Sequence, residues 1–145
     1  MKKTIITLFT IIFIVVTIIC VNYYSYMSEY KNIFKENEKF EQYKNKEIYG
    51  TQLGSIINKV IDQNTKNGIE KDEKNVFIPN EENSIQIEIY MLDSEQTYKM
   101  ETFYNSGMTN FIKYYGDIKF KCSKIEYHQK TRRVKYILFE QVQSS

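Results

Sequence analysis

The longest apolar stretch of the chain runs from Thr4 to Val21 and contains no charged residue, no proline and no glycine. Threonine is its only polar residue type. A helix over this stretch would be about 27 Å long, at about 1.5 Å per residue, which is close to the hydrocarbon thickness of a bilayer. The pattern therefore predicts a transmembrane anchor at residues 1–21 that contacts the lipid bilayer through residues 4–21.

Two other interpretations of this stretch stay open. A cleaved signal peptide needs small residues at the cleavage site, and the end of the stretch has no such pair. A lipidated cysteine is a second alternative at Cys20, although Ile19 stands where the processing enzyme requires a small residue. We therefore favour an uncleaved, single-pass anchor.

The charges that flank the anchor favour one orientation. Lys2 and Lys3 precede it and are typical of a cytoplasmic N-terminus, which would place the remaining chain outside the membrane. Lysines also occur within twenty residues of the other end, and they act against this orientation. Tyr23 and Tyr24 follow the anchor directly and suit the interface between lipid and water.

Residues 22–46 continue without proline or glycine, and their apolar positions recur in steps of three and four. This spacing predicts an amphipathic helical stalk that extends the anchor. An apolar stripe of this kind has to pack against its own domain, another protein or a second copy of the chain. The candidate contact residues for an oligomer or a protein partner are Tyr26, Tyr30, Ile33, Phe34 and Phe40.

Residues 47–145 have the length and pattern of one small α+β domain. A second helix is expected from Gln52 to about Asn64, with Thr51 as its N-cap and five aliphatic residues on one face. A surface loop follows, with a short edge strand at Val76–Ile78. The residues of the aliphatic face are Leu53, Ile56, Ile57, Val60 and Ile61.

The remaining elements alternate as strands, with one short helix at residues 107–115. Ser84–Met91 alternates isoleucine or methionine with polar residues, which predicts a half-buried strand. Residues 118–127 and 133–140 are expected to form an antiparallel hairpin, with a bulge at Ser123 and Lys124. The further expected strand is 97–101. The predicted architecture is therefore α+β, with a three- or four-stranded antiparallel sheet.

The predicted hairpin also suggests a charged surface. We expect Val134, Tyr136 and Leu138 to face the core, so that basic residues gather on the outer face. Clustered lysines on exposed strands commonly protect a sheet edge, but they can also bind nucleic acid, a cell-wall polymer or lipid headgroups. The candidate polyanion-binding residues are Lys119, Lys121, Arg133 and Lys135.

The residue types that carry catalysis are sparse. His128 is the only histidine, lies in an expected turn, and has no partner for a zinc site. Cys122 falls in an apolar alternation typical of a core residue. The acidic pairs near residues 72 and 81 lack the spacing of a calcium loop. We therefore predict neither a cofactor nor a metal, and no enzymatic activity.

The order of parts resembles that of type IV pilins and pseudopilins, with an apolar N-terminal helix, an amphipathic extension and an antiparallel sheet. Their leader cleavage site and the acid after it are absent near residues 1–5. Separately, the chain resembles a group of uncharacterised, membrane-anchored bacterial proteins, which implies no activity. The segments that carry this second resemblance are 48–51, 56–59, 98–101 and 120–122.

The sequence thus leads to two hypotheses. The first is a non-enzymatic protein of a bacterial cell membrane, with its domain outside, that acts through protein–protein contacts in a pilin-like assembly. The second is a tethered binder of a polyanion through the basic hairpin.

Overall fold

The computed structural model describes residues 2–143. The chain divides into two compact units, Met1–Glu36 and Asn37–Ser145. The first unit consists of the greater part of α1 (Lys2–Glu41), and the last turn of that helix belongs to the second unit. Residues 37–46, which the sequence pattern assigns to the stalk, therefore lie within the folded domain.

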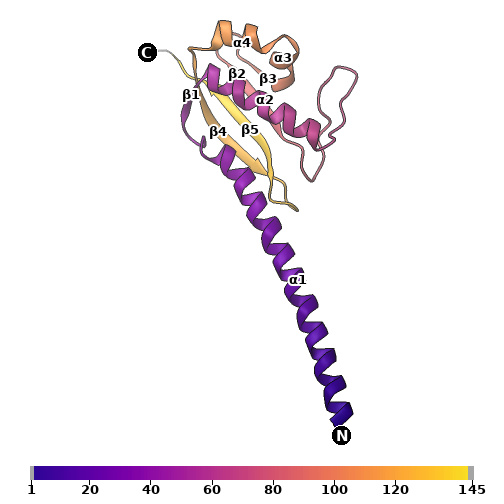
Figure 1. Ribbon diagram of the computed structural model, residues 1–145. Coiled ribbons are helices and arrows are strands. Elements are labelled where there is room, and N and C mark those ends of the chain that lie inside the picture. The colour runs from indigo at the N-terminus through magenta and orange to yellow at the C-terminus, as the bar shows by residue number, and fades with distance from the viewer. Residues whose placement is uncertain (1, 144–145) are drawn as a thin grey trace. The chain divides into compact units, whose positions relative to one another are not determined.

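The second unit contains a five-stranded sheet in the order β1-β4-β5-β2-β3. The strands are β1 (Glu47–Tyr49), β2 (Gln86–Met91), β3 (Gln96–Lys99), β4 (Lys119–Tyr127) and β5 (Val134–Gln141). The helices of the unit are α2 (Gly50–Lys66), α3 (Met100–Asn105) and α4 (Met108–Tyr115). Within this unit, α2 lies along one face of the sheet, and α3 and α4 lie at one of its ends (Figure 1).

The α+β class is confirmed, but the sheet differs from the expectation in two respects, its five strands and its mixed pairing. It is mixed, because β2 pairs with β5 in parallel, whereas the other pairs are antiparallel. The expected antiparallel sheet of three or four strands omitted β1 and this parallel pairing. Both features depend on contacts between segments far apart in the chain, so period-two alternation does not reveal them.

The core lies between α2 and the inner face of the sheet. The five aliphatic residues expected on one face of α2 are all buried, and the alternating residues of β2 are buried opposite them. The first turn of α2 is tied to the segment between α4 and β4, since Gly50 N–H donates to the Ile118 carbonyl and Thr51 N–H to the Gly116 carbonyl. Helix α2 begins at Gly50 rather than after Thr51, and Tyr49 occupies its N-cap.

The hairpin of β4 and β5 is confirmed, and so is the bulge near Ser123. The inward face of β5 was predicted wrongly. Ile137 and Phe139 are buried in place of Tyr136 and Leu138, which are half-buried. A second irregularity explains the change, because Tyr127 pairs with Val134 whereas Glu126 pairs with Tyr136. Skipping Lys135 exchanges the two faces for the rest of the strand.

The segment from Ile69 to Asn83 is a loop, and of the expected edge strand at 76–78 only an isolated bridge between Lys71 and Phe77 forms. Buried polar side chains hold this loop. Asn64 donates from Nδ2 to the Ile85 carbonyl at 2.7 Å and accepts from Ile85 N–H at 2.9 Å. Glu101, 5% exposed, accepts a hydrogen bond from Phe77 N–H.

Candidate functional site

Helix α1 is long and apolar enough to cross a membrane. Its most apolar window has a mean hydropathy of 3.0 and none of that window is buried. The hydroxyls of Thr7, Thr10 and Thr17 each donate to the carbonyl four residues earlier, and the amide of Asn22 does the same. Polar side chains satisfied in this way do not need water, so they are compatible with a lipid environment.

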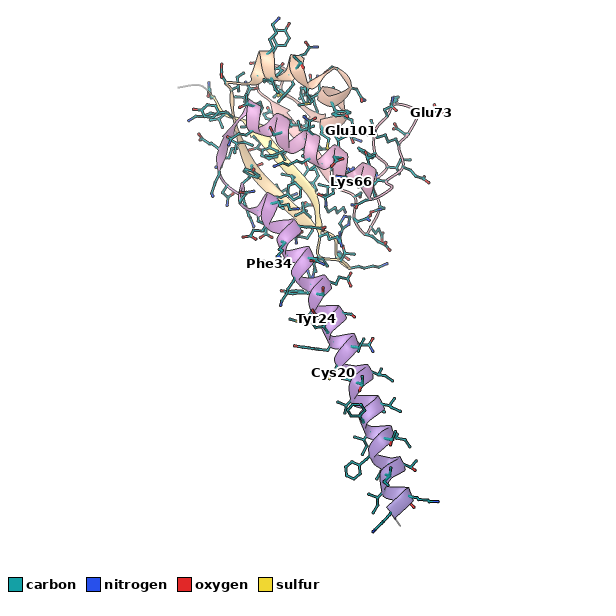
Figure 2. The ribbon with its side chains drawn as sticks, in the orientation of Figure 1. Cys20, Tyr24, Phe34, Lys66, Glu73 and Glu101 are labelled. Carbon is teal, nitrogen blue, oxygen red and sulfur yellow. The ribbon has the colours of Figure 1, made fainter. Side chains whose placement is uncertain are left out.

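Beyond this apolar window, α1 carries large side chains that are open to solvent. Tyr26 is 67% exposed, and Tyr30 and Phe34 are both 57% exposed. Figure 2 shows Tyr24 and Phe34 projecting from the helix. Ile33 is half-buried.

The structure separates the fifth candidate contact residue from the others. Phe40 is 5% exposed and belongs to the domain core. It is therefore unavailable for contact with a second chain, because it stabilises its own domain. The apolar stripe expected from the sequence is therefore divided. Its last turn packs inside the second unit, whereas Tyr30 and Phe34 stay exposed.

Hydrogen bonds fix that last turn of α1 to the hairpin. Asn37 donates from Nδ2 to the Arg132 carbonyl at 2.8 Å, and its Oδ1 accepts from Val134 N–H at 2.9 Å. Tyr127 donates its hydroxyl proton to Glu41 Oε1 at 2.7 Å. The pKa of Tyr127 is raised to about 12. Burial is the largest cause, and the hydrogen bond to Glu41 and the negative charge of Glu41 raise this pKa further.

The basic candidates do not form a continuous cationic surface. Lys119 Nζ lies 3.3 Å from Glu47 Oε2. Lys121 pairs across the sheet with Glu47 on β1 and with Glu140 on β5. Acidic side chains therefore alternate with these lysines on neighbouring strands, which reduces the local positive potential.

The other two basic candidates lie at the opposite end of the hairpin. Arg133 precedes β5, and its carbonyl accepts a hydrogen bond from His128 N–H. Lys135 occupies the second irregularity of the hairpin. The four residues are thus brought onto one hairpin but are not gathered into a single patch.

His128 and Cys122 are both buried. His128 is 2% exposed, and its Nε2 lies 2.8 Å from the Ser84 carbonyl, so the ring connects the hairpin turn to the segment that precedes β2. Cys122 is fully buried, and desolvation raises the pKa of its thiol to about 11. A thiol with a raised pKa is a poor nucleophile at neutral pH.

A half-open cleft of about 520 Å³ lies between the β2–β3 turn and helices α3 and α4. Sequence reasoning did not identify it. Its lining combines five aromatic residues with hydroxyl, amide and carboxylate side chains. The lining residues are Met91, Asp93, Ser94, Tyr98, Thr102, Phe103, Ser106, Asn110, Phe111, Tyr114 and Tyr115.

The aromatic wall of the cleft is a packed cluster centred on Phe103. Its ring centroid lies 4.9 Å from that of Phe111, 5.8 Å from that of Tyr98 and 6.3 Å from that of Tyr115. All three contacts are edge-to-face, the arrangement that aromatic pairs prefer. The sequence signal for this cluster was the high density of aromatic residues between positions 98 and 115. The spacing of these residues along the chain does not show that their rings converge.

The turn between α3 and α4 shapes this cleft. Gly107 has a φ of 97°, a conformation that L side chains rarely adopt. Its carbonyl accepts hydrogen bonds from Asn110 N–H and Phe111 N–H, which starts α4 immediately. The tight connection places Asn110 and Phe111 against α3, so both helices contribute to one wall.

Within residues 2–143, no group of three or more His, Cys, Asp or Glu side chains could hold a metal ion. Comparisons with protein-family models, with curated proteins and with solved structures each give no match. The resemblance to pilins and to membrane-anchored bacterial proteins therefore remains a prediction. Any functional proposal has to rest on the chain itself.

Proposed function

We propose that this is a single-pass protein of a bacterial cell membrane that acts through protein–protein contacts, without catalysing a reaction. In this proposal, residues 4–21 span the bilayer and the α+β domain lies outside the cytoplasm. The observation that carries the proposal is the exposure of Tyr30 and Phe34 on α1, beyond the stretch that lipid would cover. Large exposed aromatic residues are typical of interaction sites.

The position of these aromatic residues along the helix distinguishes a protein contact from a lipid contact. The headgroup region adds about 5–8 Å on each side of the hydrocarbon core. At about 1.5 Å per residue, Tyr26 lies about 7 Å beyond Val21, within reach of the headgroups. Tyr30 and Phe34 lie about 13 Å and 20 Å beyond it. The lipid headgroups can therefore reach Tyr26, but they do not account for the exposure of Tyr30 or Phe34.

A second copy of the chain is the proposed partner. Tyr23, Tyr26, Tyr30 and Ile33 follow each other at spacings of three, four and three, the pattern of a two-helix seam. Copies anchored in one membrane with the same orientation have parallel helices, so identical positions meet across the seam. This arrangement keeps the pilin-like element of the hypothesis, namely helix bundling, without requiring a filament.

Disulfide crosslinking in membranes tests the seam. Cys20→Ser removes the exposed thiol, and the buried Cys122 stays in place. A cysteine at Tyr26 or Tyr30 should give dimers on mild oxidation, because a disulfide requires Cβ atoms about 3.5–4.5 Å apart. Ser28→Cys and Asn32→Cys are the matched controls, since these positions are on the opposite side of the helix from Tyr30. Equal dimer formation at all four positions would contradict the seam.

Two further measurements complete the test. The double variant Ile33→Asp, Phe34→Asp should abolish crosslinking through Tyr30→Cys, whereas Asn32→Asp should not. Crosslinked products that contain only a different protein would replace the second copy with a hetero-partner.

Protease treatment of intact cells should remove a C-terminal epitope, with lysed cells as control. Protection until lysis would place the domain in the cytoplasm and overturn the proposed topology.

The polyanion hypothesis receives less support from the geometry. Glu47 lies beside both Lys119 and Lys121, so a polyanion approaching these lysines would also meet a carboxylate. The protein-contact proposal is therefore the one that the arrangement of side chains favours.

A further inference from the structure

We propose that the cleft between the β2–β3 turn, α3 and α4 binds a neutral saccharide. The cleft lies wholly in the second unit and shares no residue with the helix seam. Its volume of about 520 Å³ is within the range of small-ligand sites, which is about 300–1,000 Å³. The chemistry of its lining selects the class of ligand.

The charge of the lining disfavours anionic ligands. Of the described residues that line the cleft, Asp93 alone carries a charge. Lys113 Nζ lies 5.6 Å from the centroid of the Tyr114 ring, but Lys113 does not line the cleft. A phosphate or carboxylate ligand would therefore meet a carboxylate without a compensating cation in the lining.

The hydrogen-bonding groups of the lining include both acceptors and hydroxyl donors. Ser106 already donates its hydroxyl proton to the Phe103 carbonyl, so its oxygen is left as an acceptor. Asn110 donates one N–H of Nδ2 to the Ser106 carbonyl, which leaves its second N–H to donate and Oδ1 to accept. The ionised carboxylate of Asp93 can only accept. Such a site favours a ligand whose polar groups both donate and accept hydrogen bonds, as hydroxyl groups do.

The aromatic residues add the second requirement. Tyr114 is 68% exposed at the rim, and Tyr98, Phe103 and Tyr115 are half-buried along the wall. Aromatic rings offer apolar surface that favours a ligand with an apolar C–H face. A sugar ring presents C–H groups on its faces and hydroxyl donors on its edges. It therefore meets both requirements, whereas a quaternary ammonium ion would leave the donors and acceptors of the lining unused.

Saturation-transfer NMR on the full chain in lipid nanodiscs tests the proposal. Maltoside and glucoside detergents have to be avoided, because they are themselves saccharides. The probes are the trisaccharides of glucose and of N-acetylglucosamine, together with benzyltrimethylammonium, a cation without O–H donors. At least one trisaccharide is expected to bind more tightly than the cation. Tighter binding of the cation would overturn the proposal, because the charge of Asp93 and the aromatic faces would then select the ligand.

Paired substitutions locate the binding. Tyr114→Ala and Asn110→Ala are each expected to weaken trisaccharide binding about tenfold, since each removes a group exposed in the lining. Tyr104→Ala and Asn105→Ala are the matched controls, because both residues are exposed on α3 but neither lines the cleft. Absence of trisaccharide binding, or an equal loss in the control variants, would overturn the proposal. Crosslinking of the α1 seam is measured separately, so either proposal can fail without the other.

Discussion

Replacing Asn64 with alanine should destabilise the domain strongly, although the substitution is small. Asn64 is fully buried on α2, and its amide exchanges two hydrogen bonds with the backbone of Ile85, the residue that precedes β2. Alanine removes both bonds and leaves a buried N–H and a buried C=O without partners. Each such group costs about 1–3 kcal/mol. We expect a total loss of about 3 kcal/mol, a large part of the 5–15 kcal/mol typical of a folded domain.

Urea unfolding of the full chain in nanodiscs measures this loss, with labelling of Cys122 in the Cys20→Ser chain as the signal. Cys122 is fully buried, so its labelling reports the opening of the domain rather than of α1. A loss of about 3 kcal/mol should lower the urea midpoint by about 1.5–2 M. Asn58→Ala is the control, because Asn58 is exposed on the same helix. A loss below about 1 kcal/mol, or one equal to that of Asn58→Ala, would refute the reasoning.

Three further predictions concern other parts of the second unit. Gly50→Ala should lower the free energy of unfolding by more than about 2 kcal/mol, because the new Cβ would collide with the Tyr115 carbonyl. Gly68→Ala meets no atom within 4 Å and should lower it by only about 1 kcal/mol, because the φ of Gly68 is positive. Equal urea midpoints for the two variants would contradict this. Without denaturant, Cys122 should react with iodoacetamide far more slowly than a free peptide thiol at pH 8, since burial raises its pKa to about 11; a reaction as fast as that of the peptide would show that the site opens readily. The pKa of Tyr127 is raised from 10.0 to about 12, so its protonated form stabilises the fold below pH 10 and this contribution is lost between pH 10 and 12. Absorbance titration at alkaline pH should show this pKa fall in Glu41→Gln but remain above 10, because burial persists; no change would exclude a contribution from Glu41.

The sequence predicts those elements whose packing is local and periodic. The aliphatic face of α2 and the alternation of β2 are both confirmed, because a period of 3.6 or 2 directly reflects which residues face the core. The bulge at Ser123 was also visible, as a shift in phase between Cys122 and Ile125. These features need no knowledge of the partner segment.

Elements that depend on distant partners were not accessible in the same way. Residues Tyr136 to Phe139 are apolar without interruption, so alternation alone cannot decide which pair faces inward. The decision comes from pairing with β2, where Ile137 lies opposite Ile87 and Phe139 opposite Ile89. The aromatic cleft likewise requires the α3–α4 turn at Gly107, which brings residues of both helices together. Periodicity within one segment carries no record of either arrangement.

The place of β5 in the sheet has a consequence for synthesis of the protein. This strand joins β4 on one side to β2 on the other, yet it is the last of the five to leave the ribosome. Until then the nascent chain holds two separate fragments, β1 with β4 and β2 with β3, each with an unpaired edge. Unpaired edges are prone to aggregation. A ribosome that stalls before Val134 would therefore leave a chain whose sheet cannot close, and proteases or chaperones would have to deal with the two halves.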